Sequence, residues 1–532
     1  MCPINFGASV YTEHTQVPGN TRTYAGLERR SIMKLVSVVA DLAYTLQQGE
    51  LQTEITSIAF DSREVTAGGL FVAISGFQVD GHAYIQQAIG RGASAVVVEQ
   101  ESVAPEGIAV LKVADSRDAL ARMSATFYGN PTETMNLIGV TGTNGKTTIT
   151  YFIQSILKAA DRSVGLIGTI GSFIGDEAVQ SRNTTPESLH LQQLFFQMRE
   201  SDIRDCVMEV SSHALSLKRT AYCRFRTGIF TNLTPDHLEL HHSMESYFEV
   251  KAQLFDRTTA ANIVNGDDEY GRRLIERLRG RAPRLIRYGI RSENEVYATE
   301  IRCREDGTSF IAHTPVGRFA VDLHFPGMIY VYNALAAIAF GLSEGIDLSA
   351  IRRGLEAVKG IRGRMETVYA NGDYRVIVDF AHTEDGLEKL LLTLLPFVKG
   401  RIILVFGVYG AEGEHGERKR LAMGRVAGTF ADLSVVTSDN PKQQNPARLL
   451  LEIERGVQEA GGVYRSFLDR KEAIHYALNE CRKGDIVVIA GKGHETTQIL
   501  GNAEIPFNER EIVNAYMAEQ EHSGLELSAF SE

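Results

Sequence analysis

The chain has no tryptophan and only five cysteines among its 532 residues, and the shortage of cysteine excludes several classes of protein. The cysteines, at positions 2, 206, 223, 303 and 481, are far apart and show no metal-ligand spacing. Small secreted domains use closely spaced cysteines as a disulfide framework, and structural zinc sites use paired ones. We therefore expect neither, and we expect reduced, buried thiols, as in a cytoplasmic protein.

Long hydrophobic runs and a surplus of positive charge are also missing. No stretch approaches the roughly 20 apolar residues of a membrane span. The net charge is −11 at pH 7, which indicates no nucleic-acid-binding surface. Residues 1–32 lack the apolar core of a signal peptide, and a cleaner pattern starts at Met33. We expect residues 1–32 to be a disordered extension, or a start upstream of the one in use.

Hydrophobic residues make up 44% of the chain and charged residues 23%, which is ordinary for a globular protein of about two to four domains. Short β-rich runs alternate with helical ones, which predicts mostly parallel sheets covered by helices. Turns at 129–131 and 360–363 mark two boundaries. The predicted fold class is α/β with three domains, at 33–130, 131–360 and 361–532, the last Rossmann-like but without a dinucleotide fingerprint. The clearest strand candidates are 70–74, 95–99, 164–170, 205–210, 227–231, 261–265, 376–379, 401–406, 433–437 and 485–490.

Residues 137–148, Leu-Ile-Gly-Val-Thr-Gly-Thr-Asn-Gly-Lys-Thr-Thr, form the most informative stretch. An apolar run enters a glycine-rich turn, and a helical pattern follows at 149–160. This is the context of a phosphate-binding loop, in which backbone N–H groups and a lysine contact phosphates and a hydroxyl holds Mg²⁺. Five residues lie between Gly139 and Gly145, where the usual motif has four between its two glycines. We predict an ATP-using enzyme, with Lys146 at the phosphates and Thr147 at Mg²⁺, over a purely structural turn.

Two further segments place polar residues at predicted strand ends. Glu209 ends an apolar strand, where a carboxylate beside a phosphate loop is well placed for Mg²⁺. His237 follows a second strand, in a run dense in polar side chains, and is a candidate second metal ligand. A surface glutamate and a structural histidine are the alternatives. Lys251 lies in a helical pattern at 246–255, which alone indicates an ordinary solvated lysine.

Taken in order, the motifs resemble those of the Mur ligases of peptidoglycan synthesis. The branch that they resemble adds the third residue of the peptide, the UDP-N-acetylmuramoyl-tripeptide synthetases (MurE type), and the resemblance covers nearly all of residues 33–515. Several motifs in order are more specific than any one of them. They are Asp61-Ser-Arg63, Gly76-Phe-Gln-Val-Asp-Gly81, Thr141-Gly-Thr-Asn-Gly-Lys-Thr-Thr148, Asn183-Thr-Thr-Pro186, Glu209-Val-Ser-Ser-His213, Thr231-Asn-Leu-Thr-Pro-Asp-His237, Lys251-Ala-Gln-Leu-Phe255, Gly363-Arg-Met-Glu366, Val378-Asp-Phe-Ala-His-Thr383, Asp439-Asn-Pro441 and Ala490-Gly-Lys-Gly-His-Glu495.

The resemblance implies a reaction and its partners. ATP with Mg²⁺ converts a carboxylate of UDP-N-acetylmuramoyl-L-alanyl-D-glutamate into an acyl phosphate, which the amine of a free amino acid then attacks. The N-terminal domain would bind UDP, the central domain ATP and the C-terminal domain the amino acid. The third domain must close on the second, with Gly360 and Gly363 near the hinge. We expect a monomer.

The resemblance also implies site residues. The catalytic residues would be Lys146, Glu209, His237 and Lys251, and the metal would be held by Thr147, Glu209, His237 and Lys251, the last carbamylated by CO₂. ATP would be bound by Gly142, Thr143, Asn144, Gly145, Lys146, Thr147, Thr148, Arg364 and Asp379. The UDP-linked substrate would be bound by Phe60, Ser62, Phe77, Gln78, Val79, Thr184, Thr185, Ser211 and Arg219. The amino acid would be bound by Asp439, Asn440, Pro441, Lys442, Gly491 and Glu495.

The chain departs from the family pattern in four places. The turn Gly-Gly-Asp-Arg-Asp is absent, and His415 is nearest to the place of its arginine, which grips the carboxylate of the amino acid. The signature Asp-Asn-Pro-Arg ends in Lys442, which keeps the charge but loses the two-pronged grip. Tyr330 stands where an asparagine usually contacts the nucleotide, and Glu384 stands where proline is common.

The sequence leaves several alternatives for the amino acid and for the exact activity. Lys442 could pair with the distal carboxylate of meso-diaminopimelate and Glu495 with its ammonium, whereas L-lysine would bring an ammonium against Lys442. We therefore rank meso-diaminopimelate ahead of L-lysine or another amino acid. The alternatives are a divergent Mur-type ligase with another amino acid or acceptor, and a non-catalytic paralogue that binds UDP-muramoyl peptides. A P-loop motor or GTPase is disfavoured because no Asn-Lys-x-Asp run follows.

Overall fold

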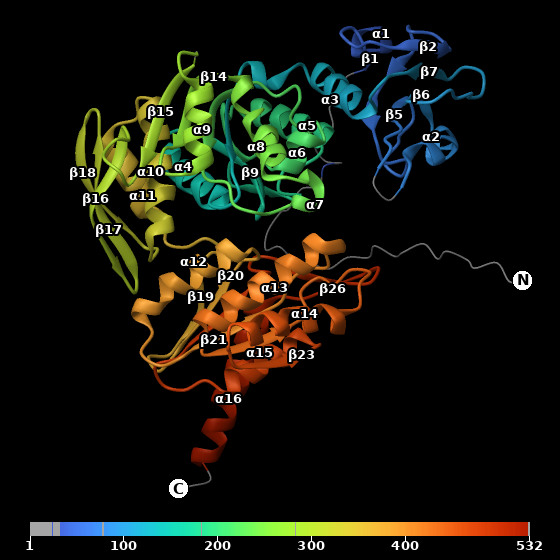
Figure 1. Ribbon diagram of the computed structural model, residues 1–532. Coiled ribbons are helices and arrows are strands. Elements are labelled where there is room, and N and C mark those ends of the chain that lie inside the picture. Colours follow the sequence, from blue (N-terminus) through green and yellow to red (C-terminus); the bar gives the residue numbers. More distant parts are fainter. Residues whose placement is uncertain (1–23, 25–31, 77–78, 182, 282, 530–532) are drawn as a thin grey trace, which may run out of the picture.

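The computed structural model describes residue 24 and residues 32–76, 79–181, 183–281 and 283–529. The extension predicted at 1–32 lies almost entirely outside these residues, as do Phe77 and Gln78. Figure 1 shows three bodies in chain order, each built on its own main sheet. The predicted α/β class with mostly parallel sheets is confirmed.

The first body holds a five-stranded sheet of order β2-β7-β6-β5-β4, parallel except at β2. The run at 93–98 is apolar and buried because helices and loops cover both faces, as parallel sheets require. The elements are β1 (Met33–Lys34), α1 (Leu35–Val38), β2 (Thr45–Gln48), β3 (Glu54–Ile55), β4 (Ser57–Ala59), β5 (Gly69–Val72), η2 (Gly81–Tyr84), α2 (Ile85–Gly90), β6 (Ala93–Val98), β7 (Ala109–Lys112), α3 (Ser116–Phe127) and η3 (Pro131–Glu133).

The central body holds an eleven-stranded sheet of order β11-β10-β9-β12-β8-β13-β14-β15-β16-β17-β18. Its middle strands are parallel, and side chains alternate between two cores: Ile138 and Val140 pack with α4, α10 and α11, while Leu137 packs with α5, α8 and α9. The elements are β8 (Asn136–Thr141), α4 (Lys146–Ala159), β9 (Val164–Gly168), β10 (Gly171–Ile174), β11 (Glu177–Val179), α5 (Ser188–Glu200), β12 (Asp205–Glu209), α6 (Ser212–Ser216), β13 (Phe225–Phe230), α7 (Leu238–His241), α8 (Met244–Ala252), η4 (Phe255–Arg257), β14 (Thr258–Asn265), α9 (Glu269–Leu278), β15 (Arg284–Gly289), β16 (Val296–Arg304), β17 (Gly307–Thr314), β18 (Gly317–Leu323), α10 (Met328–Ser343) and α11 (Leu348–Ala357).

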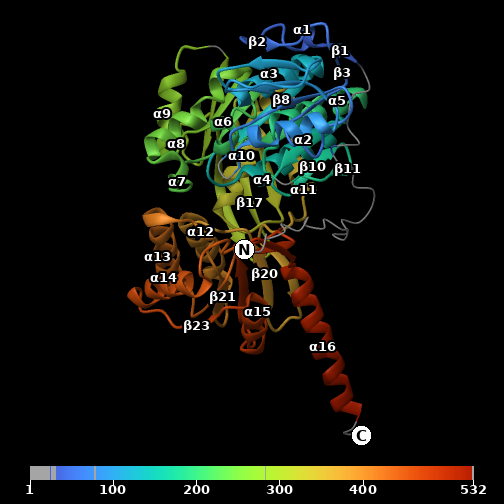
Figure 2. The same cartoon turned by 90° about the vertical axis from the view of Figure 1, so that its right-hand side faces the viewer.

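The third body holds a six-stranded sheet of order β19-β20-β24-β21-β22-β23, parallel except at β19. Its last helix, α16, runs away from the rest of the molecule in both views (Figures 1 and 2). The elements are β19 (Glu366–Ala370), β20 (Arg375–Asp379), α12 (Glu384–Leu394), η5 (Leu395–Phe397), β21 (Ile402–Phe406), α13 (Gly413–Phe430), β22 (Leu433–Thr437), α14 (Pro446–Glu459), β23 (Tyr464–Phe467), α15 (Arg470–Asn479), β24 (Ile486–Ala490), β25 (Thr497–Leu500), β26 (Ala503–Pro506) and α16 (Glu509–Ala529).

The strands predicted from the sequence are all present, with ends that move by up to three residues. The hairpins β10–β11 and β16–β18 were not predicted. The described cysteines are free, but contrary to our expectation Cys303 is exposed and Cys481 is only partly buried. Cys303 is exposed because it lies on the outer strand pair β16–β17. No helix in the described part of the chain has both the length and the apolar character to span a bilayer.

Candidate active site

The predicted phosphate-binding loop lies between β8 and the N-terminus of α4. Gly145 precedes the helix with a φ of 89°, in the left-handed region that favours glycine. A Cβ at Gly142 would lie 1.8 Å from Thr231 Oγ1, so only glycine fits there. Thr231 donates in turn to the carbonyl of Asn144 at 2.7 Å. The loop is therefore held tightly below the free N–H groups of the first helical turn, as an anion site requires.

Lys146 is folded onto this loop. Its Nζ donates to the carbonyl oxygens of Gly142 at 3.0 Å and Thr143 at 2.8 Å. Burial lowers the pKa of Lys146, and the carboxylates of Glu209 and Asp236 act in the opposite direction. A phosphate bound at the loop would bring this half-buried ammonium a full counter-charge.

Glu209 lies at the end of β12, buried beside the first turn of α4. Its Oε1 accepts from Thr147 Oγ1 at 3.0 Å, and its two oxygens accept from the N–H and hydroxyl of Thr169 at 2.8 and 2.9 Å. The Thr147 hydroxyl and the Glu209 carboxylate are hard oxygen donors that fit Mg²⁺. Among the described residues, no group of three or more His, Cys, Asp and Glu side chains could hold a metal. The pair formed by Thr147 and Glu209 supplies a single carboxylate, and Mg²⁺ usually takes one or two carboxylates plus substrate phosphates.

Lys251, on α8, is 1% exposed, so the expectation of a solvated lysine from the helical pattern is wrong. The phosphate-binding loop covers it: its Nζ donates to the carbonyl of Gly142 at 2.9 Å and lies 4.6 Å from the centroid of the Tyr247 ring. Burial lowers the pKa of Lys251 well below its usual value, the charge of Lys146 lowers it further, and Asp236 acts against both. These surroundings therefore make the neutral amine more accessible than it is in a solvated lysine.

His237 caps α7 with a φ of 54° and is partly exposed. Its Nε2 lies 3.2 Å from Asp236 Oδ2, and its ring meets that of His213 edge-on, 4.8 Å between centroids. In the described part of the chain, no hydrogen bond or ion pair joins His237 to Glu209. Lys419 of α13 reaches across from the third body to Asp236, with Nζ and Oδ1 2.9 Å apart. Burial alone would raise the pKa of Asp236, but Lys419 and His237 bring it far below the usual value.

Two more contacts join the third body to the phosphate-binding loop. Arg364 Nη2 donates to Thr147 Oγ1 at 2.9 Å, and the Arg364 guanidinium lies 4.7 Å from the centroid of the Phe380 ring. Asn144 Nδ2 donates to Asp385 Oδ2 at 2.8 Å, at the start of α12. The structure is therefore closed at this interface, with a third-body arginine on a central-body threonine.

Asp379 lies at the end of β20, below Arg364. Its two oxygens accept from the backbone N–H groups of Met365 and Ala381, each at 2.7 Å. Burial raises the pKa of Asp379, and the charge of Arg364 opposes the rise. Asp379 therefore fixes the loop that carries Arg364.

The two glycines expected near the hinge differ in their surroundings. A Cβ at Gly363 would lie 2.3 Å from the backbone nitrogen of His494, whereas one at Gly360 would meet nothing within 4 Å. Gly363 therefore belongs to the tightly packed third body. Only Gly360 has the open surroundings that a hinge needs.

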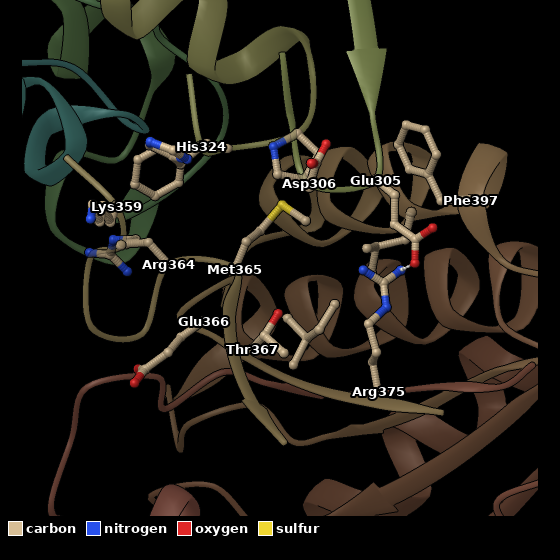
Figure 3. Close-up of a pocket in the computed structure, with 15 residues that line it drawn as sticks. Glu305, Asp306, His324, Lys359, Arg364, Met365, Glu366, Thr367, Arg375 and Phe397 are labelled. Carbon is tan, nitrogen blue, oxygen red and sulfur yellow. Dashed lines mark ion pairs between the residues drawn. The ribbon is translucent and has the colours of Figure 1, made fainter. Parts of the chain in front are cut away.

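A pocket of about 590 Å³ opens beside Arg364, between the β16–β17 turn and the start of the third body (Figure 3). An ion pair between Arg375 and Glu305, 3.1 Å apart, bridges the two bodies at its far side (Figure 3). Because Arg364 both lines the pocket and contacts Thr147, the pocket adjoins the phosphate-binding loop. Its other lining residues are Asp306, His324, Phe325, Pro326, Lys359, Gly360, Met365, Glu366, Thr367, Ile377, Leu394 and Phe397.

Three of the departures from the family pattern have clear surroundings. Tyr330 is buried, with its ring stacked on that of Phe325 at 4.7 Å between centroids, so it supports a wall of the pocket. Glu384 is the first residue of α12, directly after the N-cap Thr383. A carboxylate at this position interacts favourably with the positive end of the helix dipole. His415 is exposed on α13.

The residues expected to hold the muramoyl-dipeptide lie together beside Glu209. Thr185 Oγ1 donates to the Glu209 carbonyl at 2.7 Å and accepts from the N–H of Ser211 at 3.1 Å. Arg219 Nη1 donates to the Thr185 carbonyl at 2.9 Å. Thr184 lies next in the chain, so these side chains form one polar surface that leads to Glu209.

The residues expected to hold UDP lie farther out, in the first body. Ser62 Oγ donates to Gln87 Oε1 at 2.7 Å, and Val79 is exposed. Phe60 meets the ring of His190 edge-on, with centroids 5.3 Å apart. Since His190 lies on α5 of the central body, Phe60 stands where the first two bodies meet.

The residues expected to hold the amino acid come from the loops after β22 and β24. A Cβ at Gly491 would lie 2.9 Å from Asp439 Oδ2, so the two loops are in close contact. Asn440 Nδ2 donates to Glu495 Oε2 at 3.2 Å, from one loop to the other. The carbonyl of Pro441 would lie 2.2 Å from a Cβ at Gly410, in the loop after β21.

The charges of this region are arranged differently from the simple pairing expected at Lys442 and Glu495. Lys442, with a φ of 55°, is exposed, and its Nζ lies 5.7 Å from the centroid of the Tyr409 ring. Glu495 Oε2 lies 2.5 Å from Nζ of the fully buried Lys492. Glu495 therefore already has a cationic partner, so it attracts the ammonium of a bound amino acid less strongly than an unpaired carboxylate would.

Sequence reasoning missed several charged residues at these sites, among them Lys419, Arg470, Lys492 and Glu509. All four form ion pairs with distant or loop partners; Arg470, Lys492 and Glu509 are buried, and Lys419 is partly exposed. Lys492 lies inside the motif 490–495, and that was the one available signal. The others read as ordinary helix residues because their partners come from other elements.

Comparison with known proteins gives matches along most of the chain. The Mur ligase family catalytic domain matches residues 54–128, the Mur ligase middle domain 140–341, and the Mur ligase glutamate ligase domain 363–493. UDP-N-acetylmuramoyl-L-alanyl-D-glutamate–2,6-diaminopimelate ligase of Alkaliphilus metalliredigens is 43% identical, over 90% of this chain and 96% of that protein. The protein of the same name from Clostridioides difficile is 42% identical, over 91% of this chain and 99% of that protein.

Solved structures agree. A structure of a UDP-N-acetylmuramoyl-L-alanyl-D-glutamate–2,6-diaminopimelate ligase has a TM-score of 0.63 and 28% identity, over 92% of this chain and all of the other. MurF from Acinetobacter baumannii has a TM-score of 0.66 at 23% identity, over 87% of this chain and 96% of the other, a likeness of fold alone.

Proposed function

The chain belongs to the Mur ligase family, and we propose that it adds meso-diaminopimelate to UDP-N-acetylmuramoyl-L-alanyl-D-glutamate at the expense of ATP. The observation that carries the proposal is the contact of Arg364 with Thr147, which joins the third body to a phosphate-binding loop. The name of relatives 42–43% identical over about nine-tenths of the chain supports the choice of substrates.

ATP would bind as a substrate across the closed interface. Its phosphates would lie on residues 142–148, with Lys146 and Arg364 as the cations. The base would enter the pocket beside Arg364, where Phe325, backed by Tyr330, offers an aromatic wall. Tyr330 would then replace a hydrogen bond to the base by packing.

The residues around Glu209 fit Mg²⁺. Thr147 and Glu209 would hold it, with His237 at the edge of the site. When bound, Mg²⁺ neutralises charge on the phosphate oxygens. We further propose that Lys251 is carbamylated, because burial lowers the pKa of its amine and so favours the neutral form, whose lone pair attacks CO₂. The product would be a carboxylate-like group where an ammonium would repel the metal.

The two chemical steps follow from this arrangement. A carboxylate oxygen of the substrate attacks the γ-phosphorus and the bond to ADP breaks, which gives an acyl phosphate. The amine of the amino acid then attacks the acyl carbon, phosphate leaves, and the amine gives up a proton. Thr185, Ser211 and Arg219 would hold the substrate carboxylate toward the loop, while the closed interface excludes water.

Several coarser features belong to the same proposal. We propose that the domains run over 33–130, 131–360 and 361–532, since each main sheet draws all its strands from one of these ranges. We also propose a monomer that works in the cytoplasm, where ATP is available and free thiols such as Cys206 stay reduced.

The choice of amino acid is the part most open to test. Lys442 would meet the distal carboxylate of meso-diaminopimelate, since its ammonium has no ion-pair partner among the described residues. Phosphate release with UDP-N-acetylmuramoyl-L-alanyl-D-glutamate, ATP and a panel of amino acids measures the preference as kcat/KM. We expect meso-diaminopimelate to exceed L-lysine by at least about tenfold. A preference for L-lysine or a small neutral amino acid would contradict the role of Lys442, and no turnover with any amino acid would contradict the function.

A further inference from the structure

A fully buried ion pair lies beneath the amino-acid-binding loops. Arg470 is the first residue of α15 and Glu509 the first residue of α16, and both side chains are 0% exposed. Nε and Nη2 of Arg470 each lie 2.7 Å from Glu509 Oε1. The proposed function gives neither residue a role.

The remaining donors of Arg470 reach the two loops themselves. Nη2 donates to the carbonyl of Ala490 at 2.8 Å, and Nη1 donates to the carbonyl of Ser438 at 3.4 Å. Ala490 directly precedes Gly491, and Ser438 directly precedes Asp439. A single planar guanidinium therefore ties the start of one loop to the start of the other.

The charges around the pair indicate more than a packing role. A buried ion pair gains little stability over an apolar contact, because both ions lose their hydration. Glu509 Oε2 is buried without a hydrogen-bond partner in the described part of the chain. The other charged groups that influence Glu509 are Lys492 and Asp439, one from each loop. The pair thus lies at the centre of a buried charge cluster that includes one residue of each loop.

We propose that Arg470 and Glu509 are positioning residues that set the spacing of the loops 438–442 and 491–495, and through it the affinity for the free amino acid. Glu509 orients the guanidinium, and the guanidinium fixes the two carbonyls. This proposal rests on the proposed function, since it concerns the amino-acid end of that site.

The test compares the three Michaelis constants of the full-length enzyme in two conservative variants. Arg470→Lys keeps the positive charge but loses the fork that reaches both carbonyls. Glu509→Gln keeps an oxygen that accepts from Arg470 but removes the charge. We expect each variant to raise KM for meso-diaminopimelate about tenfold, the scale of one lost charge-assisted hydrogen bond. KM for ATP and for the UDP-linked substrate should stay within about twofold.

A matched control pair lies in the same sheet, at the ends of the strands opposite to the loops. Arg401 and Asp485 are 2.7 Å apart, at the start of β21 and β24, where these strands are farthest from the loops. Arg401→Lys should lower the thermal midpoint without changing any of the three constants. The control separates a general loss of stability from a specific loss of amino-acid binding.

The outcomes distinguish the two proposals. A wild-type enzyme that fails to turn over in the amino-acid panel overturns the proposed function. An active wild type, with folded variants whose three constants move together or whose amino-acid constant is unchanged, overturns the positioning role. If neither variant folds, the pair serves stability and the positioning role is also overturned.

Discussion

Two lysines, one in a recognisable motif and one in an ordinary helical pattern, donate to the same backbone oxygen. Lys146 follows a glycine-rich turn and Lys251 lies in a plain helical pattern, yet both donate to the carbonyl of Gly142. Burial lowers the pKa of each, more so at Lys251, which also faces the charge of Lys146. The same oxygen therefore accepts from an amine of the glycine-rich loop and from a second amine that the loop covers.

Removing the loop charge should stop catalysis without unfolding the protein. Lys146→Ala should lower kcat by at least about 100-fold, because the phosphoryl oxygens lose a preorganised cation. The thermal midpoint should change little, since the hydrogen bonds that Lys146 donates to described residues go to two backbone carbonyls. Phosphate release and thermal unfolding measure both effects. Lys158→Ala, on the last turn of the same helix and paired with Asp176, is the control and should keep full activity. A Lys146→Ala enzyme with most of its activity would rule out the phosphate-loop assignment.

The proposed carbamylation of Lys251 would make the activity of the enzyme depend on CO₂. A carbamate forms only from the neutral amine, and a lowered pKa extends the neutral form of Lys251 to lower pH. Activity should fall in CO₂-free buffer and return with bicarbonate. Lys251→Ala should be nearly inactive and partly rescued by small carboxylates. Electron density decides the chemical state: a plain ammonium in a fully active, CO₂-free enzyme would disprove the carbamate.

At the scale of elements, short apolar strands and the phosphate-binding loop could be read from the sequence because both are local patterns. The run at 486–490 is buried on both faces and needs no partner to be recognised. The strands β16–β18 were not predicted because polar and apolar residues alternate along them, as on a half-exposed sheet. Lys251 and Arg470 escaped for another reason. Their burial is decided by loops and helices far away in sequence, which no local pattern contains.

Helix α13 contributes one such long-range contact, from Lys419 to Asp236 of the central body. Lys419→Ala should leave Asp236 buried without its cation and so disfavour the closed arrangement. We expect kcat to fall about tenfold, since a smaller fraction of the enzyme is competent at any time. Arg418→Ala, one residue earlier and paired within the helix to Glu414, should have no effect. Equal activities of the two variants would show that the contact is dispensable.

The whole molecule is organised around the central body, which contacts both of the others. On one side, Tyr222 donates to Asp118 of α3 at 2.9 Å. On the other, the β16–β18 strands reach down toward the third body (Figure 1), where Glu305 meets Arg375. The pocket beside Arg364 is lined by residues of both the central and the third body.

Ligand binding at such a junction should stabilise both bodies together. ATP at about 100 times its Kd should add about 2.7 kcal/mol to the free energy of unfolding. Arg364→Ala should lose most of the resulting shift in thermal midpoint, although the arginine lies outside the body that carries the phosphate-binding loop. Thermal unfolding with and without ATP measures this, with the exposed Arg362→Ala as control. An undiminished shift in Arg364→Ala would place the nucleotide elsewhere.

The depth of Lys251 has a consequence for the time course of the enzyme. Its amine lies beneath the phosphate-binding loop, out of reach of solvent in the closed form. The proposed carbamate would then gain or lose CO₂ only when this loop moves, and a bound nucleotide would slow that movement. A carbamylated population would outlast a fall in CO₂, and an uncarbamylated one would start with a lag. The activity of the enzyme would therefore reflect, for a short time, the CO₂ concentration to which it was exposed earlier.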